Sequence, residues 1–170
     1  MRSKGFTLIE LVVVIVVLGI LATVAVPRFM NYRDDARAAT MQGVLAALKA
    51  SVDLAHTKLA LDNLEKESQV ISSREPKLKA WCEYCTFAYG YPAHYKDETW
   101  PYITRGINED IAIIFSRPHK QLAFAFKEDI SSDGKSLNTD NCYILWQSAG
   151  KRPDGTFVEA GFTLVPCASS

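Results

Sequence analysis

The sequence lacks an excess of either charge, because 19 Lys and Arg residues balance 19 Asp and Glu residues over 170 positions. A net charge of zero gives no general electrostatic attraction to nucleic acid or to an anionic surface, so no nucleic-acid partner is expected. With only four cysteines and nine glycines, the chain is neither a dense disulfide scaffold nor a collagen-like repeat. Its length suggests about one domain with an ordinary core.

Catalytic signatures are also missing. The sequence has no H-E-x-x-H, G-x-S-x-G or P-loop pattern, and His56, His94 and His119 stand alone. We therefore expect ordinary histidines, no cofactor and no enzymatic activity. A membrane-tethered enzyme is kept as an alternative, which detectable turnover would revive.

The prominent feature is an apolar N-terminal run. Only four residues between positions 6 and 26 fall outside the hydrophobic set: Thr7, Glu10, Gly19 and Thr23. As a helix, residues 6–27 would be about 33 Å long, enough to cross a hydrocarbon core of ~30 Å. The leader, residues 1–5, is short and basic, which predicts that it stays in the cytoplasm while the chain after Pro27 is exported.

Glu10 is the one ionisable residue in this run. An unpaired carboxylate at the centre of a membrane helix costs very roughly 3 kcal/mol, so Glu10 needs a partner. An alternative is that Glu10 caps the helix or reaches the membrane interface. An ordinary secretory signal, cut near residues 23–25, is disfavoured by the length of the run, by Glu10 and by Pro27.

Residues 5–15, GFTLIELVVVI, resemble the processing site and helix start of type IV pilins and type II secretion pseudopilins. In that family a prepilin peptidase cuts after the glycine and methylates the new first residue, which implies cleavage after Gly5 and an N-methylphenylalanine at Phe6. Cleavage leaves an α-amine, which is cationic at neutral pH. The resemblance implies that Glu10 meets this amine of a neighbouring subunit during assembly.

The first helix is predicted to continue to about Leu61, roughly 84 Å in all. Gly19 weakens it and Pro27 can kink it, and the resemblance implies that the stretch between them loosens on assembly. Alternatively, a membrane helix tolerates both residues without functional consequence. Apolar or small residues recur in steps of three and four on its amphipathic half, residues 28–62: Phe29, Ala36, Thr40, Gly43, Val44, Ala47, Leu48, Ser51, Val52, Ala55 and Leu59.

Residues 63–170 are predicted to form a globular domain. Residues 63–79 are polar and suggest a loop or short helix. Four segments rich in β-branched and aromatic residues predict strands: residues 111–115, 122–126, 143–146 and 157–165. The expected fold is α+β, with the long helix packed on an antiparallel sheet of about four strands, as in pilins.

The four cysteines allow three pairings, and export favours disulfides over thiols. We favour Cys142 with Cys167, because closing a loop of that size stabilises by about 3 kcal/mol. That leaves Cys82 with Cys85, while cross-pairing stays open. The first pair also resembles the C-terminal disulfide loop of many pilins. A thioredoxin-like role lacks its βαβ context, and a zinc site would need further ligands beside His94.

Two clusters have alternative interpretations. Asp129, Asp133, Asn138 and Asp140 could bind calcium, as in some pseudopilins, although a solvated turn is favoured. For the aromatic residues between positions 81 and 102 we favour core and interface packing over a carbohydrate surface, with an exposed loop near Trp100. These aromatic residues are Trp81, Tyr84, Phe87, Tyr89, Tyr91, Tyr95, Trp100 and Tyr102.

The resemblance implies a structural subunit that is stored in the bacterial inner membrane and then assembled with copies of itself into a surface pilus used for attachment. The implied partners are the prepilin peptidase and the assembly platform of the inner membrane. A pseudopilin is the alternative, disfavoured because pseudopilins commonly lack a large C-terminal disulfide loop. Further segments resemble the mannose-sensitive haemagglutinin (MSHA) branch of pilins: PRF at 27–29, DDAR at 34–37, QG at 42–43 and YGYP at 89–92.

Overall fold

The computed structural model describes most of the chain, namely residues 6–94, 99–104, 107, 109–116, 121–134, 136–138 and 141–167. For residues 24–31 and 116 it describes the backbone alone. Several residues singled out above lie outside the described residues: Gly5, Tyr95, His119 and Asp140.

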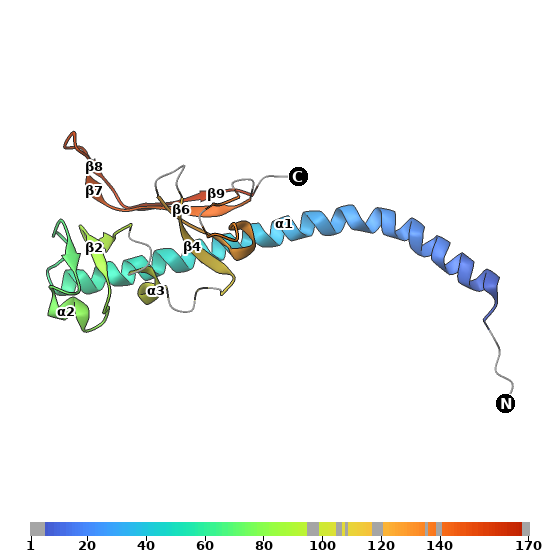
Figure 1. The fold of residues 1–170 in the computed structure, drawn as a ribbon, viewed down its shortest axis with the longest axis horizontal. Coiled ribbons are helices and arrows are strands. Elements are labelled where there is room, and N and C mark those ends of the chain that lie inside the picture. Colours follow the sequence, from blue (N-terminus) through green and yellow to red (C-terminus); the bar gives the residue numbers. More distant parts are fainter. Residues whose placement is uncertain are drawn as a thin grey trace, which may run out of the picture.

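The first element is a 54-residue helix, α1, which spans Leu8–Leu61. Its backbone stays helical through Gly19 and Pro27, and Figure 1 shows one gently curved rod whose first half projects away from the rest of the molecule. The long N-terminal helix predicted from the sequence is confirmed. Among the described residues, no helix combines the length and apolar character needed to cross a membrane. The predicted boundaries at residues 5, 27 and 62 stay predictions.

The second half of α1 packs on the globular part through one buried stripe. Its residues are three or four positions apart: Met41, Val44, Leu48, Val52, Ala55 and Leu59. The sequence analysis placed Gly43 and Ala47 on this face, but both are exposed, and Met41 was missed. The stripe is narrower than predicted because a helix lying on one layer buries only a narrow arc of its surface.

The main sheet has four antiparallel strands in the order β4-β5-β6-β9. They span Ile111–Ser116, Gln121–Phe126, Tyr143–Gln147 and Gly161–Val165. The predicted fourth strand, residues 157–165, is wrong in its first part. β8 (Phe157–Val158) pairs instead with β7 (Gly150–Lys151) in a separate hairpin. Gly155, with a φ of 83°, turns that hairpin back on itself.

A smaller antiparallel sheet, β1-β2-β3, covers the end of α1. Its strands are Val70–Ile71, Thr86–Ala88 and Tyr91–Pro92. Short helical turns complete the chain: α2 at Pro76–Lys79, α3 at Trp100–Ile103 and the 3-10 turn η1 at Lys127–Asp129. α2 fits the loop or short helix expected for residues 63–79, whereas β1 was missed because two residues carry no periodic signal.

Aromatic side chains fill the centre of the main core. Trp100 meets Phe124 and Trp146 edge to face, with ring centroids 4.9 and 5.2 Å apart. Because Trp100 is fully buried, the exposed loop expected around it is wrong at this residue. A second buried cluster contains Ala55 and Leu59 of α1 together with residues that follow the helix in the chain: Val70, Leu78, Cys82, Cys85 and Phe87.

The buried stripe can be tested against an exposed leucine on the same helix. Leu48 is fully buried, whereas Leu54 is 62% exposed. Leu48→Ala should lower the free energy of unfolding by about 2–5 kcal/mol, because it removes buried apolar atoms and leaves a cavity. Leu54→Ala should change it by less than about 0.5 kcal/mol. Thermal unfolding of the full chain in mild detergent, followed by near-UV circular dichroism, measures both, and equal losses would contradict this packing.

Candidate functional site

The N-terminus of α1 is closed by a reciprocal cap. The hydroxyl of Thr7 donates to Oε2 of Glu10 over 2.7 Å, and the backbone N–H of Thr7 donates to the same oxygen over 2.9 Å. In return, the N–H of Glu10 donates to Oγ1 of Thr7. This capping box satisfies helix N–H groups that have no partner in the preceding turn. In the single subunit, Glu10 therefore has a local partner, as the capping alternative expected.

The first half of α1 presents apolar side chains to its surroundings. Between Leu8 and Leu21 the exposed fraction of the large apolar side chains runs from 43% for Val12 to 79% for Leu8. A Cβ built on Gly19 would meet no neighbouring atom within 4 Å. A continuous apolar surface of this extent marks a region that contacts other proteins or lipid.

Two disulfides are present, and they are the two pairs that the sequence analysis favours. Cys142 precedes β6 and Cys167 follows β9, so their bond closes the end of the sheet where Tyr143 pairs with Val165. Cys82 and Cys85 are joined within the second core cluster. A cavity of about 230 Å³ separates the Cys142–Cys167 bond from the α1 residues Asp34, Asp35, Ala38, Met41 and Gln42.

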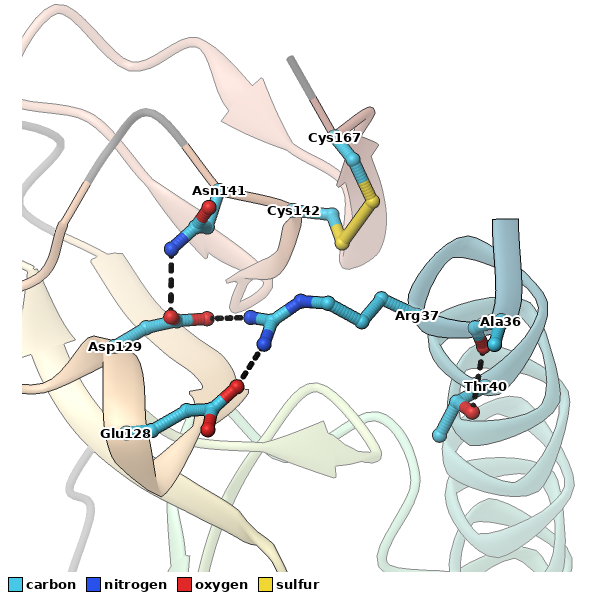
Figure 2. Close-up of a disulfide and its surroundings, with 8 residues drawn as sticks. All are labelled: Ala36, Arg37, Thr40, Glu128, Asp129, Asn141, Cys142 and Cys167. Atoms are coloured by element: carbon cyan, nitrogen blue, oxygen red, sulfur yellow. Dashed lines mark hydrogen bonds and ion pairs between the residues drawn. A yellow bond between two sulfur atoms is a disulfide. The ribbon is translucent and has the colours of Figure 1, made fainter. Parts of the chain in front are cut away.

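An arginine of α1 anchors the helix beside this disulfide. Figure 2 shows the guanidinium of Arg37 reaching from α1 to the carboxylates of Glu128 and Asp129 on η1. It also lies 4.4 Å from the ring centroid of Phe126. Asn141 donates to the second oxygen of Asp129 over 2.6 Å. The cluster thus joins α1, η1 and the segment before β6.

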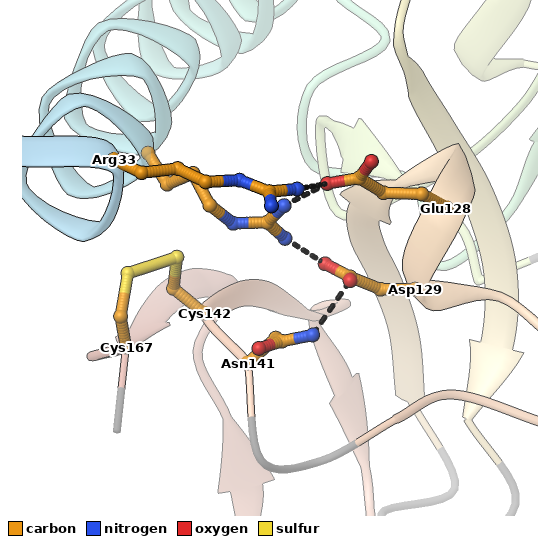
Figure 3. Close-up of polar contacts among 7 residues, drawn as sticks. Arg33, Glu128, Asp129, Asn141, Cys142 and Cys167 are labelled. Carbon is orange, nitrogen blue, oxygen red and sulfur yellow. Dashed lines mark hydrogen bonds and ion pairs between the residues drawn. A yellow bond between two sulfur atoms is a disulfide. The ribbon is translucent and has the colours of Figure 1, made fainter. Parts of the chain in front are cut away.

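Burial distinguishes Arg37 from its neighbour Arg33. The side chains of Arg37 and Asp129 are only 14% and 5% exposed. Arg33 also pairs with Glu128 (Figure 3), at a distance of 3.5 Å between the guanidinium and the carboxylate, but its side chain is 71% exposed. Water screens the Arg33 pair strongly, whereas Asp129 depends on Arg37 for its counter-charge. Sequence reasoning missed this anchor, and its only signal was the occurrence of Arg37 in the motif at 34–37.

The carboxylate of Asp129, one of the calcium ligands considered in the sequence analysis, is already engaged by other side chains. Asp129 is occupied by Arg37 and Asn141, Asp133 accepts from the hydroxyl of Ser131, and Asp140 lies outside the described residues. Within the described part of the chain, no three His, Cys, Asp or Glu residues are placed to hold a metal ion.

The described histidines have structural contacts. His56 stacks on Tyr91 with ring centroids 4.6 Å apart, and its Nδ1 lies 2.9 Å from the carbonyl oxygen of Gly90. His56 thereby holds the turn between β2 and β3 against α1. His94 lies 3.4 Å from the hydroxyl of Ser148.

Comparison with known proteins concerns mainly this N-terminal helix. The family described as the prokaryotic N-terminal methylation motif matches residues 1–26. The Type IV narrow pilus major component of Thermus thermophilus is 49% identical over 55 residues, which are 32% of this chain and 47% of that protein. The Type IV major alpha-pilin of Moraxella bovis is 48% identical over 53 residues, 31% of this chain and 33% of that protein.

A secretion protein is similar over the same part of the chain. The Type II secretion system core protein G of Pseudomonas aeruginosa is 43% identical over 53 residues, 31% of this chain and 37% of that protein. The chain thus covers less than half the length of each of these relatives. No solved structure matches the chain.

Residues 1–26 thus match the prokaryotic N-terminal methylation motif, and the capped start of α1 lies within this match. Over its first third, the chain is similar to type IV pilins and to a type II secretion protein, which supports a place in the type IV pilin family in the broad sense that includes the type II secretion pseudopilins.

The anchor can be tested by comparing the two arginines. Arg37→Leu should lower the free energy of unfolding by about 3–5 kcal/mol, because it leaves the buried carboxylate of Asp129 without a counter-charge. Arg33→Leu, the matched control, should cost less than about 1 kcal/mol. Adding Asp129→Asn to Arg37→Leu should recover part of the loss. Thermal unfolding of the full chain measures all three, and similar losses for the two single variants would contradict the anchor.

Proposed function

We propose that the chain is a structural subunit of an MSHA-like type IV pilus, which assembles through the first half of α1 into a surface filament used for attachment. The observation that carries this proposal is the exposed apolar surface between Leu8 and Leu21, because among the described side chains of α1 those in the core clusters all belong to its second half. Burying one large apolar side chain stabilises by about 1.5–3 kcal/mol, so this surface strongly favours a covering layer.

Two successive environments supply that cover in the proposal. Residues 6–27 are first stored as a single-pass segment of the bacterial inner membrane, with the globular part outside the cytoplasm. Prepilin peptidase removes residues 1–5, and the assembly platform transfers the subunit to the filament. Helices of identical subunits then replace lipid around α1. No enzymatic activity belongs to this role.

Glu10 changes partner during this transfer. In the single subunit its carboxylate accepts two hydrogen bonds from Thr7. In the filament, the cationic amine of Phe6 from a neighbouring subunit adds a full opposite charge in a low-dielectric surrounding. Such a charge-assisted hydrogen bond is stronger than one to a neutral donor. It also fixes the axial position of one helix against the next, because a mispositioned subunit would leave both charges unpaired.

A pseudopilin is the second candidate, favoured by the similarity to the type II secretion protein. The Cys142–Cys167 loop supports the pilus, since pseudopilins commonly lack such a loop. Electron microscopy of cells with and without the protein separates the two functions. Loss of surface fibres supports the pilus, whereas intact fibres together with failed secretion support the pseudopilin.

One prediction from the proposed function concerns processing. Protein taken from filaments should have the intact mass of a chain that begins at a methylated Phe6. Replacing Gly5 with a larger residue should block this cleavage, because a side chain obstructs access to the backbone at the membrane surface. A chain that begins near Val26 would instead establish ordinary signal cleavage and overturn the assembly proposal.

Another prediction separates the pairing of Glu10 from its capping role. Glu10→Val should insert into the membrane at least as well as the wild type and should be processed normally, but filaments should be lost. Thr7→Ala removes the hydroxyl of the cap, at a cost of about 0.5–2 kcal/mol, but keeps the carboxylate. Thr7→Ala should therefore still assemble. The measurements are the amounts of membrane-bound subunit and of sheared filament.

Glu10→Asp provides a finer comparison, because it keeps the charge and shortens the side chain by one methylene. Partial assembly of this variant supports pairing. Normal filament yield from Glu10→Val would show that the pairing role is wrong, and loss of filaments from Thr7→Ala alone would assign the effect to the cap.

A further inference from the structure

A cavity of about 530 Å³ lies where the two larger sheets and the β7–β8 hairpin meet. Its walls come from the segment before β1, from β2 and the residues after β3, from one end of β4, β5 and β6, and from the hairpin. Figure 1 shows this hairpin at the end of the globular part farthest from the N-terminus. The hairpin that contributes to the cavity thus lies far from the assembly half of α1. Its volume lies within the range typical of small-molecule sites.

The charged side chains of the cavity are cationic. Lys151 and Arg152 belong to its lining, and none of the described lining residues is Asp or Glu. Neither cation forms an ion pair with a described residue. Asp154, at the tip of the hairpin, accepts a hydrogen bond from the N–H of Thr156 over 2.9 Å, which holds the pKa of its carboxyl below the ordinary value. Asp154 is thereby engaged in its own turn, and the cavity favours an anionic ligand.

The uncharged polar groups suit a ligand with several hydroxyl groups. They are Ser68, Gln69, His94, Gln121, Gln147 and Ser148. Gln121 donates to Oε1 of Gln147 over 2.6 Å, and Gln147 donates to the carbonyl of Ser148 over 3.1 Å. These bonds fix both amides and leave an amide oxygen of Gln121 and an amide hydrogen of Gln147 for a ligand. An acceptor beside a donor matches neighbouring hydroxyl groups, each of which can both donate and accept.

An aromatic wall completes the cavity. Phe115 and Trp146 both line the cavity; Phe115 is 40% exposed, whereas Trp146 is almost fully buried. The face of a sugar ring is apolar through its C–H groups, and an exposed aromatic side chain covers such a face well. An inorganic anion would use neither this wall nor the row of amides.

We propose that this cavity binds a sugar ring that carries a carboxylate, of the uronic-acid type. Lys151 and Arg152 bind the carboxylate, the glutamines and serines bind the hydroxyl groups, and Phe115 covers one face of the ring. The site belongs to the single subunit and does not depend on assembly, so its test is independent of the proposed filament function.

The test uses the unassembled full chain in mild detergent and three probes: methyl glucuronide, methyl glucoside and acetate. Titration calorimetry should give saturable binding of the glucuronide with a dissociation constant of roughly 1 mM. The glucoside, which lacks only the carboxylate, should bind at least about tenfold more weakly, and so should acetate, which lacks the ring. The fluorescence of the tryptophans provides a second signal, because Trp146 lines the cavity.

Paired variants locate the site. Lys151→Gln with Arg152→Gln should weaken glucuronide binding about tenfold and bring it to the level of the glucoside. Lys49→Gln with Arg74→Gln removes two exposed cations that do not line the cavity and should leave binding unchanged. Equal binding of glucuronide and glucoside would overturn the charge argument, equal binding of glucuronide and acetate would reduce the site to an anion site, and no binding at 20-fold the expected constant would overturn the proposal.

Discussion

Everything in this molecule depends on one helix that has to be covered by two different kinds of surface. From Met41 to Leu59, the chain itself supplies the cover, through two sheets and their core aromatics. From Leu8 to Leu21, the described chain leaves apolar side chains exposed. One end of the helix therefore belongs to the core of the single subunit, and the other end presents an exposed apolar surface. Folding of a single subunit buries the apolar side chains of the first end and leaves those of the second exposed.

The cap at Thr7 and Glu10 fits this division. A carboxylate in an apolar segment is costly, and the capping box lowers that cost by giving it two hydrogen bonds within its own turn. These bonds are to neutral donors. A cationic donor forms a stronger hydrogen bond with a carboxylate, so in the proposed filament Glu10 would exchange its bonds to Thr7 for a bond to the amine. A residue with one adequate partner and one better partner suits a subunit that has to be stable in two surroundings.

The sequence predicted the features that follow from regular spacing or from a specific motif. The long helix followed from steps of three and four. The strands predicted at residues 111–115 and 122–126 followed from runs of β-branched and aromatic residues, and each is one residue longer in the structure. Long-range contacts could not be predicted in this way. Arg37 and Asp129 are 92 positions apart, and no periodicity indicates that they meet. The division of residues 157–165 was missed for the same reason, because strand propensity does not say which partner a strand will take.

The position of Arg37 explains how the helix is attached to the globular part near the point where its exposed half ends. Arg37 follows the exposed half of α1 and comes just before Met41, where the buried stripe begins. Its carboxylate partners lie on η1. One of them, Asp129, also accepts a hydrogen bond from Asn141, which directly precedes the disulfide-bonded Cys142. In the proposed filament, a force on the assembly half of α1 reaches the globular part through Arg33 and Arg37, and of these two contacts only that of Arg37 is largely buried. This largely buried charge pair resists separation, because pulling Arg37 away leaves the buried carboxylate of Asp129 without a counter-charge. The adjacent disulfide prevents the end of the sheet from opening in response, since β6 and β9 cannot separate while Cys142 and Cys167 are bonded.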